Sequence, residues 1–258
     1  MNTPPSLFLS HGPPTVLEEK TPAHDFLAGL CGSIPRPKAI LVVSAHWLTE
    51  VPTVSSAAAP ETIYDFYGFP ENLYGAVYPA PGDPDLASAL MGRLKGAGFS
   101  ARVDHKRGFD HGTWVPLKLI YPKADIPVIQ LSVSPGQNPT WHLALGEHLR
   151  PLRDEGVLII GSGGLTHNLH EYVRSPKNNP TPDWVADFTR WVYAAIIEGR
   201  SRDLSGYRER APHGDLNHPT LDHLLPLFVA LGASGGKGRR VHHSYDRGVL
   251  AMDAYRFD

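Results

Sequence analysis

The chain has 258 residues, and 41% of them are hydrophobic, which is enough apolar material for a globular core. Its 24 Lys and Arg residues nearly balance its 26 Asp and Glu residues, and no basic block is long enough to follow a phosphate backbone, so we expect no nucleic-acid partner. No apolar stretch approaches the roughly 18 residues of a membrane helix, and the N-terminus has no secretory pattern, so we expect a cytoplasmic protein with no membrane partner.

Two buried strands are predicted near the start of the chain, over residues 6–10 and 39–44. Both are short apolar runs bounded by polar residues, Gly or Pro, and such continuous runs are typical of parallel or central strands. A histidine follows each run, His11 directly and His46 after one intervening residue. Both strands are therefore expected to deliver an imidazole at their carboxyl end.

An alternation of helices and strands is predicted for the middle of the chain. Leucines that recur every four residues predict a surface helix over residues 83–97. Apolar runs at 126–133 and 157–161 predict two further strands, and leucines at helical spacing predict a helix over 139–155 between them. This alternation favours an α/β fold.

Helices are expected to dominate the last third of the sequence. Residues 182–198 have an amphipathic pattern, and the largely apolar stretch 220–231 predicts a helix in which Pro226 causes a bend or a late start. No low-complexity linker or repeat divides the chain. We predict a single α/β domain over residues 1–258, with a mixed central sheet flanked by helices and the active site at the carboxyl ends of the strands.

Histidine is the residue type that points to chemistry. The chain has 14 histidines but only one cysteine, Cys31, which excludes an internal disulfide and a thiolate zinc cage. Any metal must therefore be held by imidazole or carboxylate groups. Because ligands of open α/β sheets bind beyond the carboxyl ends of the strands, His11 and His46 are expected to meet there. His167, which follows the strand over 157–161 and a Gly-rich turn, joins the same rim.

Three further histidines lie in loops or near helix starts. His111 is in the stretch "GFDHGTW", a tight loop before a predicted short helix. His218 and His223 are in "NHPTLDHLLPL", and because they are five residues apart, only one of them is expected to enter the site. Imidazole-rich sites without thiolate suit Fe(II), Zn(II) or Cu(II), and three histidines, or two with a carboxylate, complete such a site.

Several motifs occur in a characteristic order: "LFLSHGPP", "VVSAHW", "IYDFYGFPENLY", "YPAPGDPDLA", "GFDHGTW", "IPVIQLS", "GSGGLTHNL" and "HPTLDHLLPL". With them the chain resembles the class III extradiol ring-cleavage dioxygenases. It is most similar to the DOPA 4,5-dioxygenase type, a branch of the protocatechuate 4,5-dioxygenase catalytic-subunit superfamily, and the resemblance extends over residues 7–231. The resemblance implies one catalytic domain that cleaves a DOPA-like catechol ring with O2 at a non-haem Fe(II) site, so the expected partners are a small aromatic diol and O2.

The resemblance also implies a metal ligand set of His11, His46 and His223, with His218 as a neighbour. Better-known members of the superfamily complete the site with a glutamate, whereas this branch has a histidine there, next to Asp222. A site of three neutral ligands lacks the anionic group that helps to hold ferrous iron and becomes attractive to zinc. We therefore expect Fe(II) in the active form and allow for Zn(II) in purified protein, where it would be inactive because zinc has no accessible redox change.

Two further roles follow from the resemblance, and a third is predicted from composition. His167 is implied as the catalytic acid/base and His111 as the donor to a substrate or oxygen atom. Tyr64, Phe66 and Phe69 are predicted to form a wall for the flat catechol ring, and the alternative is an aromatic mini-core under a long loop. Trp47, beside His46, is interpreted as structural.

Two other functions are consistent with the same histidines. In a zinc-dependent hydrolase, a metal-bound water would attack an amide with His167 as the base. His167 could instead supply a fourth nitrogen to a closed zinc site, which would leave no open position for oxygen chemistry. A non-catalytic metal-binding homologue is the second alternative, and the retained histidines argue against it. The sequence leaves monomer and dimer open.

Overall fold

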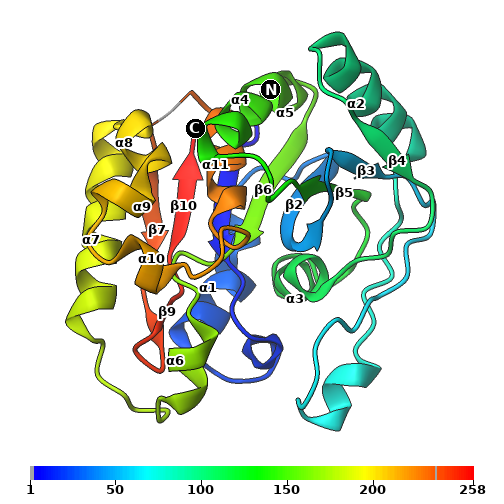
Figure 1. Cartoon of the computed structure of the whole chain (residues 1–258). Coiled ribbons are helices and arrows are strands. Elements are labelled where there is room, and N and C mark those ends of the chain that lie inside the picture. Colours follow the sequence, from blue (N-terminus) through cyan, green and yellow to red (C-terminus); the bar gives the residue numbers. More distant parts are fainter. Residues whose placement is uncertain (1–2, 236) are drawn as a thin grey trace.

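The structure, a computed structural model, describes residues 3–235 and 237–258. Its main feature is an eight-stranded sheet in the order β4-β3-β5-β2-β6-β1-β10-β7, accompanied by a small hairpin of β8 and β9 (Figure 1). The strands are β1 (Ser6–Ser10), β2 (Ala39–Leu48), β3 (Thr53–Ser55), β4 (Arg102–Asp104), β5 (Val128–Val133), β6 (Val157–Gly163), β7 (Arg239–His242), β8 (Tyr245–Asp246), β9 (Leu250–Ala251) and β10 (Ala254–Phe257).

Helices surround this sheet in the part of the chain that the structure describes (Figure 1). The α-helices are α1 (Pro22–Gly29), α2 (Pro84–Gly96), α3 (His111–Ile120), α4 (Pro139–Leu149), α5 (Pro151–Asp154), α6 (Leu169–Arg174), α7 (Asp183–Glu198), α8 (Ser201–Ser205), α9 (Tyr207–Arg210), α10 (Gly214–Asn217) and α11 (Leu225–Gly232). Short 3-10 helices are η1 (Pro14–Leu17), η2 (Leu30–Ser33) and η3 (Glu71–Gly75). None of the described helices combines the length and hydrophobicity that crossing a membrane requires.

The centre of the sheet is parallel, and it joins an antiparallel strand on each side. Strand β6 pairs in parallel with both β1 and β2, and β2 pairs in parallel with β5. On the two sides, β10 runs antiparallel to β1, and β3 runs antiparallel to β5. The predicted mixed sheet flanked by helices is therefore confirmed, and the four parallel strands end at one edge.

Both faces of the central strands are buried, which explains their continuous hydrophobicity. Along β2, Ile40 and Val42 pack in the core that includes residues of α1 and α3, whereas Leu41 and Val43 pack in the opposite core with α2, α4 and α11. Successive side chains of a strand point to opposite faces, so an unbroken apolar run supplies both cores. Helices thus hold the parallel strands on both sides.

Two predicted helices differ from the observed ones because of proline. The helix expected over 139–155 is broken into α4 and α5, since Pro151 has no N–H to continue the hydrogen-bond ladder. The helix expected over 220–231 begins late, at Leu225, with Pro226 in its first turn, where the missing N–H costs least. Residues 221–224 form a turn instead, and this turn carries His223.

Candidate active site

The candidate site lies where the parallel strands end. His11 directly follows β1, as predicted. Strand β2 continues to Leu48, beyond its predicted end, but its register with β5 shifts between Ser44 and Leu48, so His46 lies past the regular pairing. The turn of His223 is fastened to the end of β6, since the backbone N–H of Gly164 donates to the carbonyl of His223 at 2.9 Å. Histidines that are far apart in sequence thus reach one edge of the sheet.

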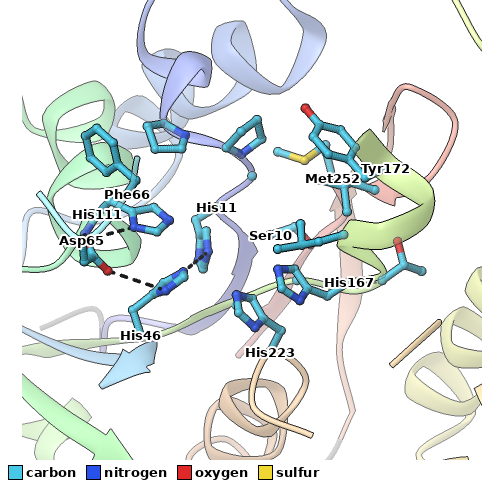
Figure 2. Close-up of a pocket in the computed structure, with 18 of the residues that line it drawn as sticks. Ser10, His11, His46, Asp65, Phe66, His111, His167, Tyr172, His223 and Met252 are labelled. Carbon is cyan, nitrogen blue, oxygen red and sulfur yellow. Dashed lines mark hydrogen bonds and ion pairs between the residues drawn. The ribbon is translucent and has the colours of Figure 1, made fainter. Parts of the chain in front are cut away.

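The structure brings together His11, His46 and His223 (Figure 2). Each offers one ring nitrogen, and these nitrogens lie within 4.8 Å of one another. The Nε2 atoms of His11 and His46 are 3.0 Å apart. The Nε2 atom of His223 is buried and has no hydrogen-bond partner in the described part of the chain. A buried polar atom without a partner is costly, so its orientation points to a ligand.

The second ring nitrogens of His11 and His223 have partners that fix the tautomers. The hydroxyl of Ser162 donates to the carbonyl of Gly112, so its oxygen is left to accept from Nδ1 of His11 at 3.0 Å. The carboxylate of Asp222 accepts from Nδ1 of His223 at 2.5 Å. Both imidazoles therefore turn an Nε2 lone pair toward the centre of the site, which is how metal-binding histidines are commonly oriented.

The electrostatics of this cluster suit a cation. Burial lowers the pKa of His11 and of His46 well below the usual imidazole range, and the nearby His111 lowers both further. Neutral imidazoles are the form that binds metal. The Nε2 atoms of His11 and His46, 3.0 Å apart, are close enough for both to lie at about 2.1 Å from one shared metal ion. The three nitrogens therefore meet the donor requirements of Fe(II) or Zn(II).

Asp65 is a site residue that the sequence analysis did not predict. Its Oδ1 accepts from the backbone N–H of His111 at 2.9 Å and lies 3.0 Å from Nδ1 of the same residue, while its Oδ2 lies 3.6 Å from Nδ1 of His46 (Figure 2). Burial raises the pKa of Asp65, but the hydrogen bonds and charge of His111 lower it below its usual value. From the stretch that contains Asp65, the sequence predicted only an aromatic wall and no charged site residue.

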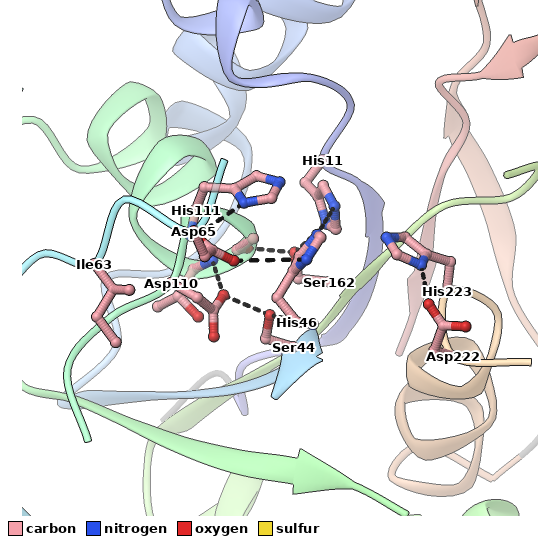
Figure 3. Close-up of polar contacts among 12 residues, drawn as sticks. His11, Ser44, His46, Ile63, Asp65, Asp110, His111, Ser162, Asp222 and His223 are labelled. Atoms are coloured by element: carbon pink, nitrogen blue, oxygen red, sulfur yellow. Dashed lines mark hydrogen bonds and ion pairs between the residues drawn. The ribbon is translucent and has the colours of Figure 1, made fainter. Parts of the chain in front are cut away.

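A buried network behind His46 and His111 holds β2 against α3 (Figure 3). Asp110 caps α3 by accepting from the N–H of Thr113, so His111 is the first residue of the helix. The same carboxylate accepts from the hydroxyl of Ser44 at 2.6 Å and pairs with Arg107 at 2.8 Å. Since Ser44 is two residues before His46, one buried acid positions both histidines.

The remaining histidines, His167 and His218, lie in different surroundings. His167 stacks on His223, with ring centroids 3.3 Å apart and planes within 6°. Burial and the adjacent His223 lower the pKa of His167 to about 2, so its imidazole is neutral. His218 is fully buried outside the cavity, with Nε2 2.8 Å from the carbonyl of Leu165 and its ring against Phe188. His223, and not His218, enters the site.

A cavity of about 340 Å³ surrounds the histidines, and its other walls are mainly apolar. Phe66 and Phe69 line it, as predicted for the substrate wall. Tyr64 does not belong to the lining, since its ring packs against the core and its hydroxyl donates to the carbonyl of Ala76 at 3.0 Å. Trp47 is buried, with the guanidinium of Arg107 above its ring. The aromatic stretch therefore forms both a wall and a mini-core.

Comparisons with known proteins identify the family of the chain. Residues 5–257 match the family model described as the catalytic LigB subunit of aromatic ring-opening dioxygenase. The chain is 44% identical to the 4,5-DOPA dioxygenase extradiol of Beta vulgaris, over 99% of this chain and 97% of the relative, and 41% identical to the protein of that name from Escherichia coli K12, over 90% and 86%. A crystal structure of an uncharacterized Escherichia coli K12 protein superposes with a TM-score of 0.81 at 36% identity, covering 99% of this chain and all of that one. The chain therefore belongs to the LigB family of aromatic ring-opening dioxygenases.

Proposed function

We propose that this protein is an extradiol dioxygenase that opens a catechol-type, DOPA-like ring with O2 at a non-haem Fe(II) site. Its partners would be a small aromatic diol and O2, and residues 1–258 would form its single catalytic domain. The observation that carries the proposal is the convergence of three imidazole nitrogens in a largely apolar cavity. The names of the relatives, 4,5-DOPA dioxygenase extradiol, support the choice of substrate.

His11, His46 and His223 are the residues that would hold the metal. A ferrous ion bound there would supply the electron-transfer chemistry that O2 requires, which Zn(II) does not offer. Ser162 and Asp222 keep two of these imidazoles in the tautomer that presents Nε2. The chain's own contribution is therefore a set of ligands whose orientation is fixed before metal binds.

His111 and His167 lie on opposite sides of the ligand cluster, within reach of a bound ring (Figure 2). His167 lines the cavity beside the ligand cluster, so it is the group proposed to take a proton from a catechol hydroxyl and to return that proton when the ring opens. His111, whose Nδ1 faces Asp65, would donate from its other nitrogen as an imidazolium paired with that carboxylate, at the place where negative charge develops on oxygen. Phe66 and Phe69 exclude water and orient the flat ring.

Oxygen consumption after anaerobic loading tests the proposal. The metal-free protein is reconstituted with Fe(II) or with Zn(II), mixed with a small panel of catechols, and exposed to air in an oxygen electrode. We expect only the iron form to consume O2, in a one-to-one ratio with catechol. His223→Ala should lose metal and activity, whereas the matched variant His218→Ala should retain both. A fully iron-loaded protein that consumes no O2 with any catechol would contradict the proposal and favour the zinc-dependent hydrolase.

A further inference from the structure

The cavity around the histidines does not explain how a charged ring substituent is recognised. In the described part of the chain its lining contains no Lys or Arg, and its one carboxylate, Asp65, already faces two histidines. An amino-acid or propionate substituent carries a carboxylate at neutral pH, and burying an unpaired charge is unfavourable. The partner for such a group must therefore lie outside this inner cavity.

A second, more polar cavity of about 640 Å³ adjoins the first. The two share residues of their walls, so a ring substituent can extend from one into the other: Pro13, Tyr67, Phe69, Tyr172, Val173 and Met252. Tyr172 and Met252 lie on the side of the inner cavity away from His111 and Phe66 (Figure 2). The outer cavity contains two cationic side chains, those of Lys177 and Arg247.

Of these two cations, only Arg247 is positioned by neighbouring groups and has no salt-bridge partner among the described residues. Lys177 is 72% exposed and its Nζ already pairs with Glu19 at 3.1 Å. The guanidinium of Arg247 lies over the ring of Tyr172, 4.9 Å from its centroid, and Nη1 donates to the carbonyl of Ser175 at 3.1 Å. Two carboxylates also line this cavity, but Glu19 pairs with Lys177 and Asp246 accepts from the hydroxyl of Tyr172. The charge of Asp246 acts on Arg247, yet no acidic side chain in the described residues forms a salt bridge with it, which leaves N–H groups of the guanidinium for a ligand.

The backbone at Arg247 supports a functional role. Arg247 has a φ of 50° at the tip of the β8–β9 hairpin, a left-handed conformation that is unfavourable for a residue other than glycine. Asn179 Nδ2 donates to its carbonyl at 3.2 Å, and Tyr172 donates to the neighbouring Asp246 at 2.8 Å. The same hairpin contributes Leu250 to the inner cavity. One rigid element therefore links the place for the ring to the guanidinium.

We propose that Arg247 is a specificity-determining residue that binds the carboxylate of the substrate's side chain. This inference rests on the proposed function and names the substrate class within it, namely catechols that carry a short carboxylate-bearing substituent. A guanidinium presents parallel N–H donors that match a carboxylate, and stacking on Tyr172 limits the freedom it loses on binding. The ring would lie among the histidines and its substituent would extend past Tyr172 and Met252.

Steady-state kinetics of Arg247→Gln with four substrates test the inference. DOPA and 3,4-dihydroxyphenylpropionate carry a carboxylate, whereas dopamine and 4-methylcatechol do not. We expect kcat/KM to fall roughly 10- to 100-fold for the two carboxylates, the range of a lost charge-assisted hydrogen bond, and less than about twofold for the other two. The loss should appear mainly in KM, and Arg247→Lys should restore part of it.

Two matched variants, a measurement of iron content and a measurement of the thermal midpoint complete the experiment. Arg174→Gln removes an exposed arginine of α6 that lines neither cavity, and Lys177→Gln removes the other cation of the outer cavity. Both should behave like the parent protein. Iron content and thermal midpoint should be unchanged in Arg247→Gln. An equal loss for all four substrates, no loss, or a selective loss in Lys177→Gln alone would overturn the inference. A parent protein that cleaves none of the four would instead overturn the proposed function.

Discussion

At the scale of single residues, the site has no anionic group among its proposed ligands, and its carboxylates contact the ligand histidines instead. The three proposed ligands are neutral imidazoles, but Asp222 contacts His223 at 2.5 Å and Asp65 lies 3.6 Å from His46. Burial raises the pKa of Asp222, yet the hydrogen bond from His223 contributes to lowering it below its usual range, so the group is ionised. Negative charge behind an imidazole makes it a stronger ligand and favours a cation at the centre.

This arrangement predicts the effect of Asp222→Asn. An asparagine keeps the shape but loses the charge, so metal affinity should fall about 10- to 100-fold while the fold is retained. Titration of the metal-free protein with Fe(II) under anaerobic conditions measures the change. Asp215→Asn, at an exposed acid that pairs with Arg208 on the surface, is the matched control and should leave affinity unchanged. Equal affinities for Asp222→Asn and the parent would show that the carboxylate does not support the ligand.

Removal of the His167 side chain distinguishes an acid/base residue from a metal ligand. His167→Ala should retain metal, because its imidazole stacks on His223 and lies outside the cluster of His11, His46 and His223. Its kcat should fall about 10²- to 10⁴-fold, the usual contribution of a general acid/base. Metal content and oxygen uptake are measured on the same preparation. A variant that purifies without metal would make His167 a fourth ligand and would favour a closed zinc site.

At the scale of elements, the position of His223 depends on how closely its turn approaches β6. A Cβ added at Gly163 would lie 2.1 Å from the carbonyl oxygen of His223, and one added at Gly161 would lie 2.2 Å from that of Pro226. Only glycine permits this contact between backbones. The late start of α11 at Leu225 leaves His223 in the turn that rests on this glycine surface.

Gly163→Ala should therefore destabilise the protein and weaken metal binding together. We expect a loss of at least about 1–3 kcal/mol, the usual cost of overpacking, because the clash is with backbone and cannot be relieved by a side-chain rotation. Gly92→Ala in α2 is the control, since an added Cβ meets nothing within 4 Å and alanine favours a helix. Urea unfolding and metal titration of both variants provide the comparison, and a Gly163→Ala protein as stable as Gly92→Ala would contradict the packing argument.

Residues at strand ends could be predicted from the sequence, whereas residues placed by long loops could not. Strand ends carry a local pattern, so His11, His46 and His167 could be predicted to share one rim. Asp65 could not, because its contact with His111 joins positions 46 residues apart through a loop without periodicity. That loop is tied to α3 by tertiary hydrogen bonds, among them one of 3.0 Å from Trp114 Nε1 to the carbonyl of Ile63. The same loop path decides why Phe66 lines the cavity whereas the ring of Tyr64 packs against the core.

At the scale of the whole molecule, buried neutral histidines make stability depend on pH. Burial lowers the pKa of His142 and of His218 to about 4, against 6.5 for an unperturbed imidazole. In His142, Nε2 accepts from the N–H of Ser134 at 3.3 Å, a contact that protonation would remove. Between these two pKa values the unfolded chain binds more protons than the folded one, so acid favours unfolding.

The metal-free protein should therefore lose stability as the pH falls from about 6.5 and level off, for these two groups, below about 4. Each histidine contributes at most about 3.5 kcal/mol, from roughly 1.4 kcal/mol for each pKa unit. Urea unfolding at several pH values, in the presence of a chelator, measures the slope. His142→Gln should flatten it. A free energy of unfolding that stays constant or rises between pH 6.5 and pH 4 would exclude this linkage.

An iron-loaded site of His11, His46 and His223 is expected to open a catechol ring next to its hydroxyl groups. The most direct measurement is mass spectrometry of the product formed from DOPA by the Fe(II) protein under ¹⁸O2. Addition of one O2 to one catechol with cleavage of a single ring bond gives a semialdehyde that keeps all atoms of both reactants. We predict a yellow semialdehyde that contains two ¹⁸O atoms before exchange with water. A diacid opened between the two hydroxyls, or a product without ¹⁸O, would contradict the account.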